Sequence, residues 1–256
     1  SLQRDKELQR EFLTNIIHPK DRILYHDTSV ARNWINVRPS TYHQVIPDPD
    51  FVVLCRARLM FSPTIDLDDC PFCKRKDMPA NHAHSCSMFS EWRLARHNYQ
   101  IAILKEFSPD NAIREAILDK QQVPQPCPLP ASLREQVRSR RQRNRLTRDK
   151  IIADLFIPQS RRAIDVSVVA TRERDISNAH SARRADMEKR RKYQPAIQNG
   201  SINDVVPFIV GPFGNLGESA NQYLNETMTK AKASEVRSRL AIAAARGTAK
   251  IILAWI

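Results

Sequence analysis

The chain has 256 residues, with 41 lysine and arginine residues against 28 acidic ones, a formal net charge of +13 and a pI of about 9.9. This length allows one sizeable core or two smaller ones, and the basic excess predicts a polyanionic partner such as nucleic acid. No apolar run of about eighteen residues and no signal peptide occur, so we expect a soluble, intracellular protein without a membrane partner.

The first part of the chain reads as a small helical platform over 1–66. An amphipathic helix is expected over 2–17, and a second helical stretch over 30–36 carries Trp34. Asp48 or Asp50 is expected to cap a third helix that continues through Leu54.

Four metal-ligating side chains follow within seventeen residues, spaced Cys-x2-Cys-x8-His-x3-Cys: Cys70, Cys73, His82 and Cys86. Three thiolates and one imidazole make a closed tetrahedral zinc site, which predicts a structural CCHC zinc knuckle. The alternative is a set of ordinary buried cysteines. His84 could replace His82 as the ligand, because both lie just before Cys86, and we expect one of the two histidines to face solvent.

A helix is predicted over 90–107, where it carries Arg96 and His97 and completes a knuckle region over 67–107. Residues 108–148 are rich in proline and arginine and are expected to form a long linker with one helix near 131–144. Its arginines are candidate phosphate contacts, although a solvated, partly disordered linker explains them equally well. These are Arg138, Arg140, Arg141, Arg143 and Arg145.

The last part, 149–256, changes to extended segments mixed with helices. Two β-rich runs, 151–157 and 163–169, are expected to form an antiparallel hairpin. A helix over 179–193, a third strand over 205–210, a glycine-rich turn and two more helices follow. We therefore expect an α/β fold in which helices flank a small central sheet.

Each strand of the predicted hairpin carries one acid in its middle, Asp154 and Asp165. Two facing carboxylates repel each other unless a cation lies between them, and Mg2+ or Mn2+ suits such oxygen ligands. The alternative is that one aspartate ends its strand in solvent or pairs with an arginine. On the following helix Lys189, Lys192 and Tyr193 share one face, which also fits a plain basic helix.

The order of these motifs resembles the C-terminal zinc-knuckle and restriction-enzyme-like endonuclease region of non-LTR retrotransposon reverse transcriptases. The likeness covers nearly the whole chain, from the Trp34 helix and the knuckle through the two strand acids to the helix Ala-x-x-Glu-Lys-x-x-Lys-Tyr. It continues through Val206-Pro207, Gly214 and Gly217 to Arg246-Gly247. Ala153 stands where the family usually has proline, and a possible further acid is missing at Gln125, for which Glu115 on a helical stretch is the expected substitute.

The resemblance implies a PD-(D/E)xK-like nuclease fold with Asp154 and Asp165 as ligands of Mg2+ or Mn2+. It further implies that Lys189 completes the catalytic site and that Tyr193 lines it. Arg96, His97 and Lys192 would brace the site or contact nucleic acid. The implied task is to nick chromosomal DNA in the nucleus so that the cut end primes reverse transcription, with RNA as a second partner and the polymerase domain upstream of Ser1. A catalytically inactive nucleic-acid-binding module and a docking platform for the polymerase are the alternatives.

Overall fold

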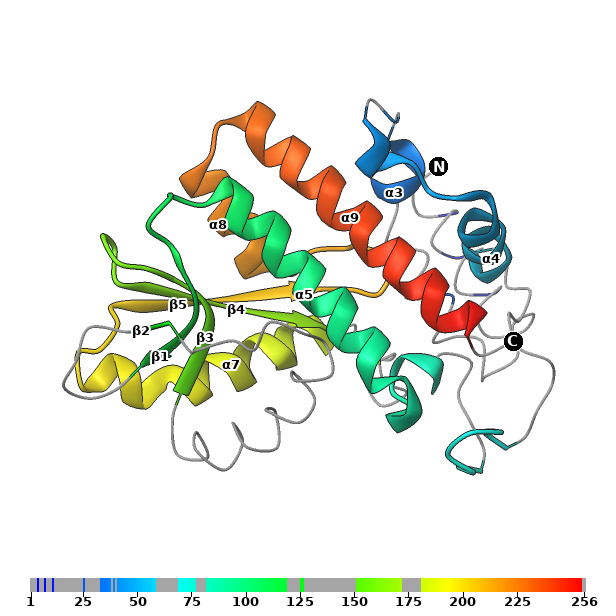
Figure 1. Ribbon diagram of the computed structural model, residues 1–256, viewed down its shortest axis with the longest axis horizontal. Helices are drawn as coiled ribbons and strands as arrows, with labels where there is room; N and C mark the ends of the chain where they lie inside the picture. The colour runs from blue at the N-terminus through cyan, green and yellow to red at the C-terminus, as the bar shows by residue number, and fades with distance from the viewer. Residues whose placement is uncertain are drawn as a thin grey trace.

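The computed structural model describes residues 4, 7, 11, 25, 33–37, 39, 41–58, 69–76, 82–118, 125–126, 151–171 and 181–254. Within them the chain has an α/β fold, a mixed sheet with helices on both faces (Figure 1). The helices expected over 2–17 and 131–144 and the arginine-rich run fall almost wholly outside these residues. In the described part, no helix combines the length and apolar character that crossing a bilayer requires.

The sheet has the strand order β2-β1-β3-β4-β5. Its strands are β1 (Ile113–Leu118), β2 (Gln125–Pro126), β3 (Ile151–Ile157), β4 (Arg162–Val168) and β5 (Asp204–Val210). The predicted hairpin is confirmed, because β3 and β4 are antiparallel neighbours in which Leu155 pairs with Ile164 and Ile157 with Arg162. β5 then joins β4 in parallel, a connection made by the intervening helix.

Strand β1 corrects the expectation that 108–148 is only a linker, and it also corrects the helical assignment of Glu115. Ala116 and Leu118 of this strand are buried, so the segment belongs to the core. Glu115 has a φ of 51°, and the ladder between β1 and β3 passes from the Arg114–Leu155 pair to the Ala116–Ala153 pair. The pairing is therefore interrupted at Asp154, the residue across from Glu115.

Helices cover the two faces of the sheet unequally. Helix α7 (Ser181–Gln198) covers one face, where Tyr193 and Ala196 pack with Phe156 and Ala163. The other face carries α5 (Ser90–Phe107), α8 (Glu218–Thr227) and α9 (Lys230–Leu253). This second core contains more large side chains, and each fully buried leucine, isoleucine or phenylalanine contributes about 1.5–3 kcal/mol. They include Ile101, Leu104, Leu155, Ile164, Phe208, Leu224 and Leu240.

Helix α9 also supports the N-terminal elements on its far side. Trp34 of α3 (Asn33–Asn36) and Leu54 of α4 (Asp48–Arg58) pack on an alanine-rich face of α9. The small alanines allow α3 and α4 to approach α9 closely. On another face of α9, Gly247 allows the close approach of α5, because an added Cβ would lie 2.6 Å from Cγ of Arg96. One helix thus contacts the sheet layer on one side and the helical platform on the other.

Candidate functional site

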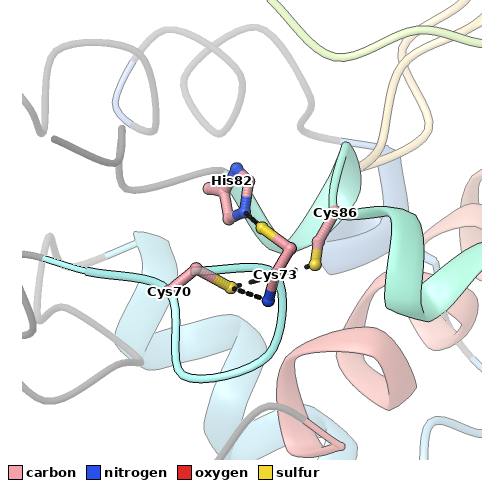
Figure 2. A group of neighbouring side chains, drawn as sticks. All are labelled: Cys70, Cys73, His82 and Cys86. Atoms are coloured by element: carbon pink, nitrogen blue, oxygen red, sulfur yellow. Dashed lines mark hydrogen bonds between the residues drawn. The ribbon is translucent and has the colours of Figure 1, made fainter. Parts of the chain in front are cut away.

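The four predicted zinc ligands converge in the structure. Their ligand atoms all lie within 4.8 Å of one another, and Figure 2 shows the side chains pointing toward a common centre. The Sγ atoms of Cys70 and Cys86 are 3.9 Å apart, and Cys73 Sγ is 3.2 Å from Nε2 of His82. Tetrahedral zinc with bonds of about 2.0–2.3 Å separates its ligand atoms by roughly 3.5–3.8 Å. The cluster therefore has the size of a metal site, and the sulfur spacing is far longer than a disulfide bond.

The structure distinguishes the two histidines by their contacts. His82, in the short helix η4 (His82–His84), directs Nε2 toward Cys73. His84 is buried against the ring of Phe213, with ring centroids 6.3 Å apart. Burial, followed by the charges of Arg96 and Arg93, lowers the pKa of His84 to about 3. The expectation that one histidine faces solvent is wrong, because both are buried, and His82 is the member of the cluster.

The knuckle has its own small core, which joins it to the rest of the molecule. Phe89, at the end of the short helix η5 (Ser87–Phe89), packs with Cys70 and Cys86 and makes an edge contact with Phe72. Ile251 of α9 completes this cluster. The backbone N–H of Cys73 donates to Sγ of Cys70 at 3.3 Å, a contact that stabilises a thiolate. These residues fit a structural zinc ion, whose contribution would be to hold this short loop folded.

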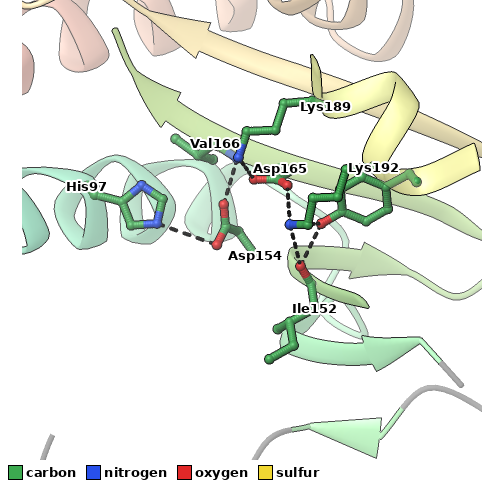
Figure 3. A network of polar contacts seen from close by, with 8 residues as sticks. His97, Ile152, Asp154, Asp165, Val166, Lys189 and Lys192 are labelled. Carbon is green, nitrogen blue, oxygen red and sulfur yellow. Dashed lines mark hydrogen bonds and ion pairs between the residues drawn. The ribbon is translucent and has the colours of Figure 1, made fainter. Parts of the chain in front are cut away.

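The strand acids lie where the hairpin ladder ends. Asp154 and Asp165 are the first residues beyond the Leu155–Ile164 pair, and there the side chain of Asp154 replaces backbone pairing. Its Oδ2 accepts a hydrogen bond from the backbone N–H of Val166 at 2.6 Å, so the carboxylate lies against the backbone that follows Asp165 (Figure 3). Its Oδ1 is 3.4 Å from Nε2 of His97, a residue on α5.

Asp165 is approached from the opposite layer of the fold. Lys189 Nζ donates to its Oδ1 at 2.6 Å, and Lys192 Nζ donates to its Oδ2 at 2.9 Å. Burial raises the pKa of the Asp165 carboxyl, but the charges and hydrogen bonds of the two lysines outweigh burial and hold that pKa below its ordinary value. The shared face predicted for Lys189, Lys192 and Tyr193 therefore does point at the second acid.

Tyr193 is completely buried beneath this site. Its hydroxyl donates to the backbone carbonyl of Ile152 at 2.6 Å, which fixes α7 to β3. Burial, together with the charges of Asp165 and Asp154, raises the pKa of Tyr193 well above its ordinary value. The phenol is therefore a protonated hydrogen-bond donor at neutral pH, and both carboxylates act on it.

The predicted nucleic-acid contacts are placed differently. Arg96 is only 5% exposed and donates to Oγ1 of Thr248 at 2.8 Å, so it braces α5 against α9 and has no surface for a phosphate. His97 is half-buried beside Asp154, and Lys192 donates to Asp165. The five linker arginines lie outside the described residues. Sequence reasoning named bracing as one role for Arg96 but could not identify its partner, which lies 152 positions away, and it missed the His97–Asp154 pair.

Comparisons with known proteins leave the chain without an assigned family. A scan against protein-family models finds no match, and neither the search of curated proteins nor that of solved structures finds one. The site is therefore interpreted from its own geometry: a Cys3His cluster able to hold a metal such as zinc, and a strand-acid site with two lysines, a histidine and a buried tyrosine.

Proposed function

We propose that the protein is a metal-dependent DNA endonuclease module stabilised by a structural zinc knuckle. The observation that carries the proposal is that two acids on neighbouring strands lie just beyond the Leu155–Ile164 pair, and that a lysine from the next helix places its Nζ 2.6 Å from Asp165. Acid pairs with a helical or strand lysine are suited to phosphodiester chemistry, because they combine cation ligands with a positive group for the phosphate.

The donor set suits a hard divalent ion such as Mg2+ or Mn2+. Asp154 and Asp165 would hold it through carboxylate oxygens. When bound, such an ion makes water a better nucleophile and offsets charge on the scissile phosphate. Lys189 then neutralises phosphate charge, His97 orients the Asp154 carboxylate through its 3.4 Å contact, and Tyr193 fixes the distance between α7 and β3.

The resemblance described above supplies the more specific form of the proposal. In that form the module nicks DNA for target-primed reverse transcription in the nucleus, within a retrotransposon polyprotein whose polymerase lies upstream and whose RNA is a second partner. The fold class, the Cys3His cluster and the basic excess of the chain agree with this proposal.

The proposal is tested by nicking of supercoiled plasmid in the presence of Mn2+. We expect Asp154→Asn, Asp165→Asn and Lys189→Met each to reduce nicking at least 100-fold, because each removes a charged group from the acid site. Asp186→Asn is the matched control, since Asp186 lies on α7 like Lys189 but pairs with Arg190 at 2.7 Å, away from the two strand acids. Equal nicking by the wild type, all three site variants and an EDTA-treated sample would refute the enzyme.

One observation favours a non-catalytic nucleic-acid-binding module instead. The two ammonium groups on Asp165 already neutralise it, as in a structural charge cluster. Such a module binds DNA without cutting it. In a calorimetric titration with Mn2+, the wild type and Asp165→Asn would then give the same binding heat. The nuclease predicts Mn2+ binding that Asp165→Asn abolishes and Asp186→Asn retains. A third alternative, a docking platform for the polymerase, predicts weak DNA binding that is insensitive to salt.

A further inference from the structure

A pocket between α5 and α9 is not used by either site described above. Its cavity volume is about 320 Å³, at the lower end of the range for small-molecule sites. It is lined by Trp92, Ala95, Arg96, Tyr99, Ala243, Arg246, Gly247 and Lys250. The small residues Ala95 and Ala243 leave room for the hollow, whereas the side chain of Arg96 packs closely on Gly247.

Two aromatic rings on α5 line the pocket and remain accessible. Trp92 is 45% exposed and Tyr99 is 41% exposed, so both rings keep surface that a ligand can contact. They are seven residues apart, two helical turns, and so lie on one face about 10 Å apart along the axis. A stacked nucleic-acid strand advances about 3.4 Å per nucleotide, so the two rings span roughly three nucleotides.

The opposite wall supplies positive charge. Arg246 and Lys250 lie one turn apart on α9, whereas Arg96 of α5 is buried and donates to Thr248, so it adds no surface for a phosphate. Asp50 of α4 is buried near these two cations: burial raises the pKa of its carboxyl, and the charges of Lys250 and Arg246 oppose that rise. The pocket therefore has an aromatic wall for planar groups and a cationic wall for phosphates.

We propose that this pocket binds unpaired nucleotides of a single-stranded nucleic acid, with bases stacked on Trp92 and Tyr99 and phosphates paired with Arg246 and Lys250. Stacking platforms beside cations are the general means of binding single strands, because every base has a π-face and every linkage a charge. A duplex keeps its base faces covered and does not enter a hollow of this size.

The site is separate from the acid site, so it does not depend on the proposed nuclease activity. His97 on α5 contacts Asp154 on the sheet. The pocket, by contrast, lies between α5 and α9. Loss of single-strand binding and loss of cleavage are therefore distinguishable outcomes. The pocket also adjoins the knuckle, because Ile251 follows Lys250 directly and packs with Cys70 and Cys86.

The test is binding of fluorescently labelled twelve-nucleotide dT and rU strands, and of a duplex of equal length, measured by anisotropy. We expect Trp92→Ala and Tyr99→Ala each to weaken single-strand binding by about 5- to 100-fold and to leave duplex binding within twofold. Trp92→Phe should retain most of the affinity, because it keeps a ring. Tyr42→Ala is the matched control, since Tyr42 is 79% exposed and does not line the pocket.

The cationic wall is tested by salt dependence. Changing both Arg246 and Lys250 to glutamine should reduce the slope of log K against log salt for single strands by about 1.4, or roughly 0.7 per lost phosphate contact. Equal losses for dT and rU mean that the pocket does not distinguish the two strands, whereas a loss confined to one identifies the kind of strand that it accepts. Wild-type affinity in the Trp92→Ala, Tyr99→Ala double variant overturns the proposal, as does an equal loss on duplex.

Discussion

The knuckle and the strand-acid site both gather charged groups, but they differ in what neutralises those groups. In the knuckle, Cys70, Cys73 and Cys86 bring three potential thiolates within 4.8 Å of one another and of a histidine, with no cation among the four. At the acid site, Asp165 already accepts hydrogen bonds from Lys189 and Lys192. Charges of one sign that share a small volume need a counter-charge. The four knuckle side chains supply no counter-charge of their own, which suits a bound metal ion, whereas the acid site carries two ammonium groups.

The largest expected effect is therefore the removal of metal from the knuckle. Cys73→Ser should lose one zinc per chain and destabilise the protein by about 3 kcal/mol or more, roughly 6–12 °C in Tm, because structural zinc sites hold their loops folded. Metal content by mass spectrometry and thermal unfolding measure this. Cys55→Ser is the control, since Cys55 is a free, half-buried cysteine of α4 outside the cluster. A metal content of zero in the wild type would contradict the prediction that the knuckle binds zinc.

A smaller effect is expected at the acid site. Asp165→Asn leaves two ammonium groups facing an uncharged amide, which should cost about 2–3 kcal/mol in the free energy of unfolding. This is less than for a fully buried pair, since the side chains of Lys189 and Lys192 are 23% and 45% exposed. Urea unfolding with EDTA present measures it without any metal. A change below about 0.5 kcal/mol would mean that the site is not neutralised by its lysines.

The smallest expected effect is a pH dependence of the difference in unfolding free energy between the wild type and Asp165→Asn. The pKa of Asp165 is lower in the folded chain than its ordinary value of 3.8, so the charged carboxylate contributes stability at any pH above that value. The contribution is lost as the pH falls through the lowered, folded-state pKa. The gap in unfolding free energy between wild type and Asp165→Asn should hence be constant from pH 7 to about 5 and narrow below about 4. A gap that widens in acid would contradict this sign.

Local patterns predicted much of this architecture. The helix over 90–107 was expected at the bounds that α5 has, and the hairpin around Asp154 and Asp165 has the expected pairing. The ligand spacing predicted the Cys3His cluster, because its members are close in the chain. The lysine face of α7 followed from helical periodicity alone.

Contacts between distant segments could not be predicted in this way. Strand β1 was missed because Arg114 and Glu115 break the alternation of strand residues, and Glu115 adopts a positive φ that no pattern indicates. Arg96 was expected to brace the site or to contact nucleic acid, but its partner Thr248 lies far away in the chain, on α9. The neutralisation of Asp165 by both lysines likewise depends on tertiary distances rather than on spacing.

Helix α9 contacts three separate cores of the molecule. Its 24 residues extend about 36 Å, and different faces of it enter these cores: Leu240 that of the sheet, Ala245 that of the platform, and Ile251, near its end, that of the knuckle. A rotation of this rod about its own length would disturb all three at once. Because Ile251 lies in the last turn of α9, unfolding of the knuckle would reach the sheet through this helix.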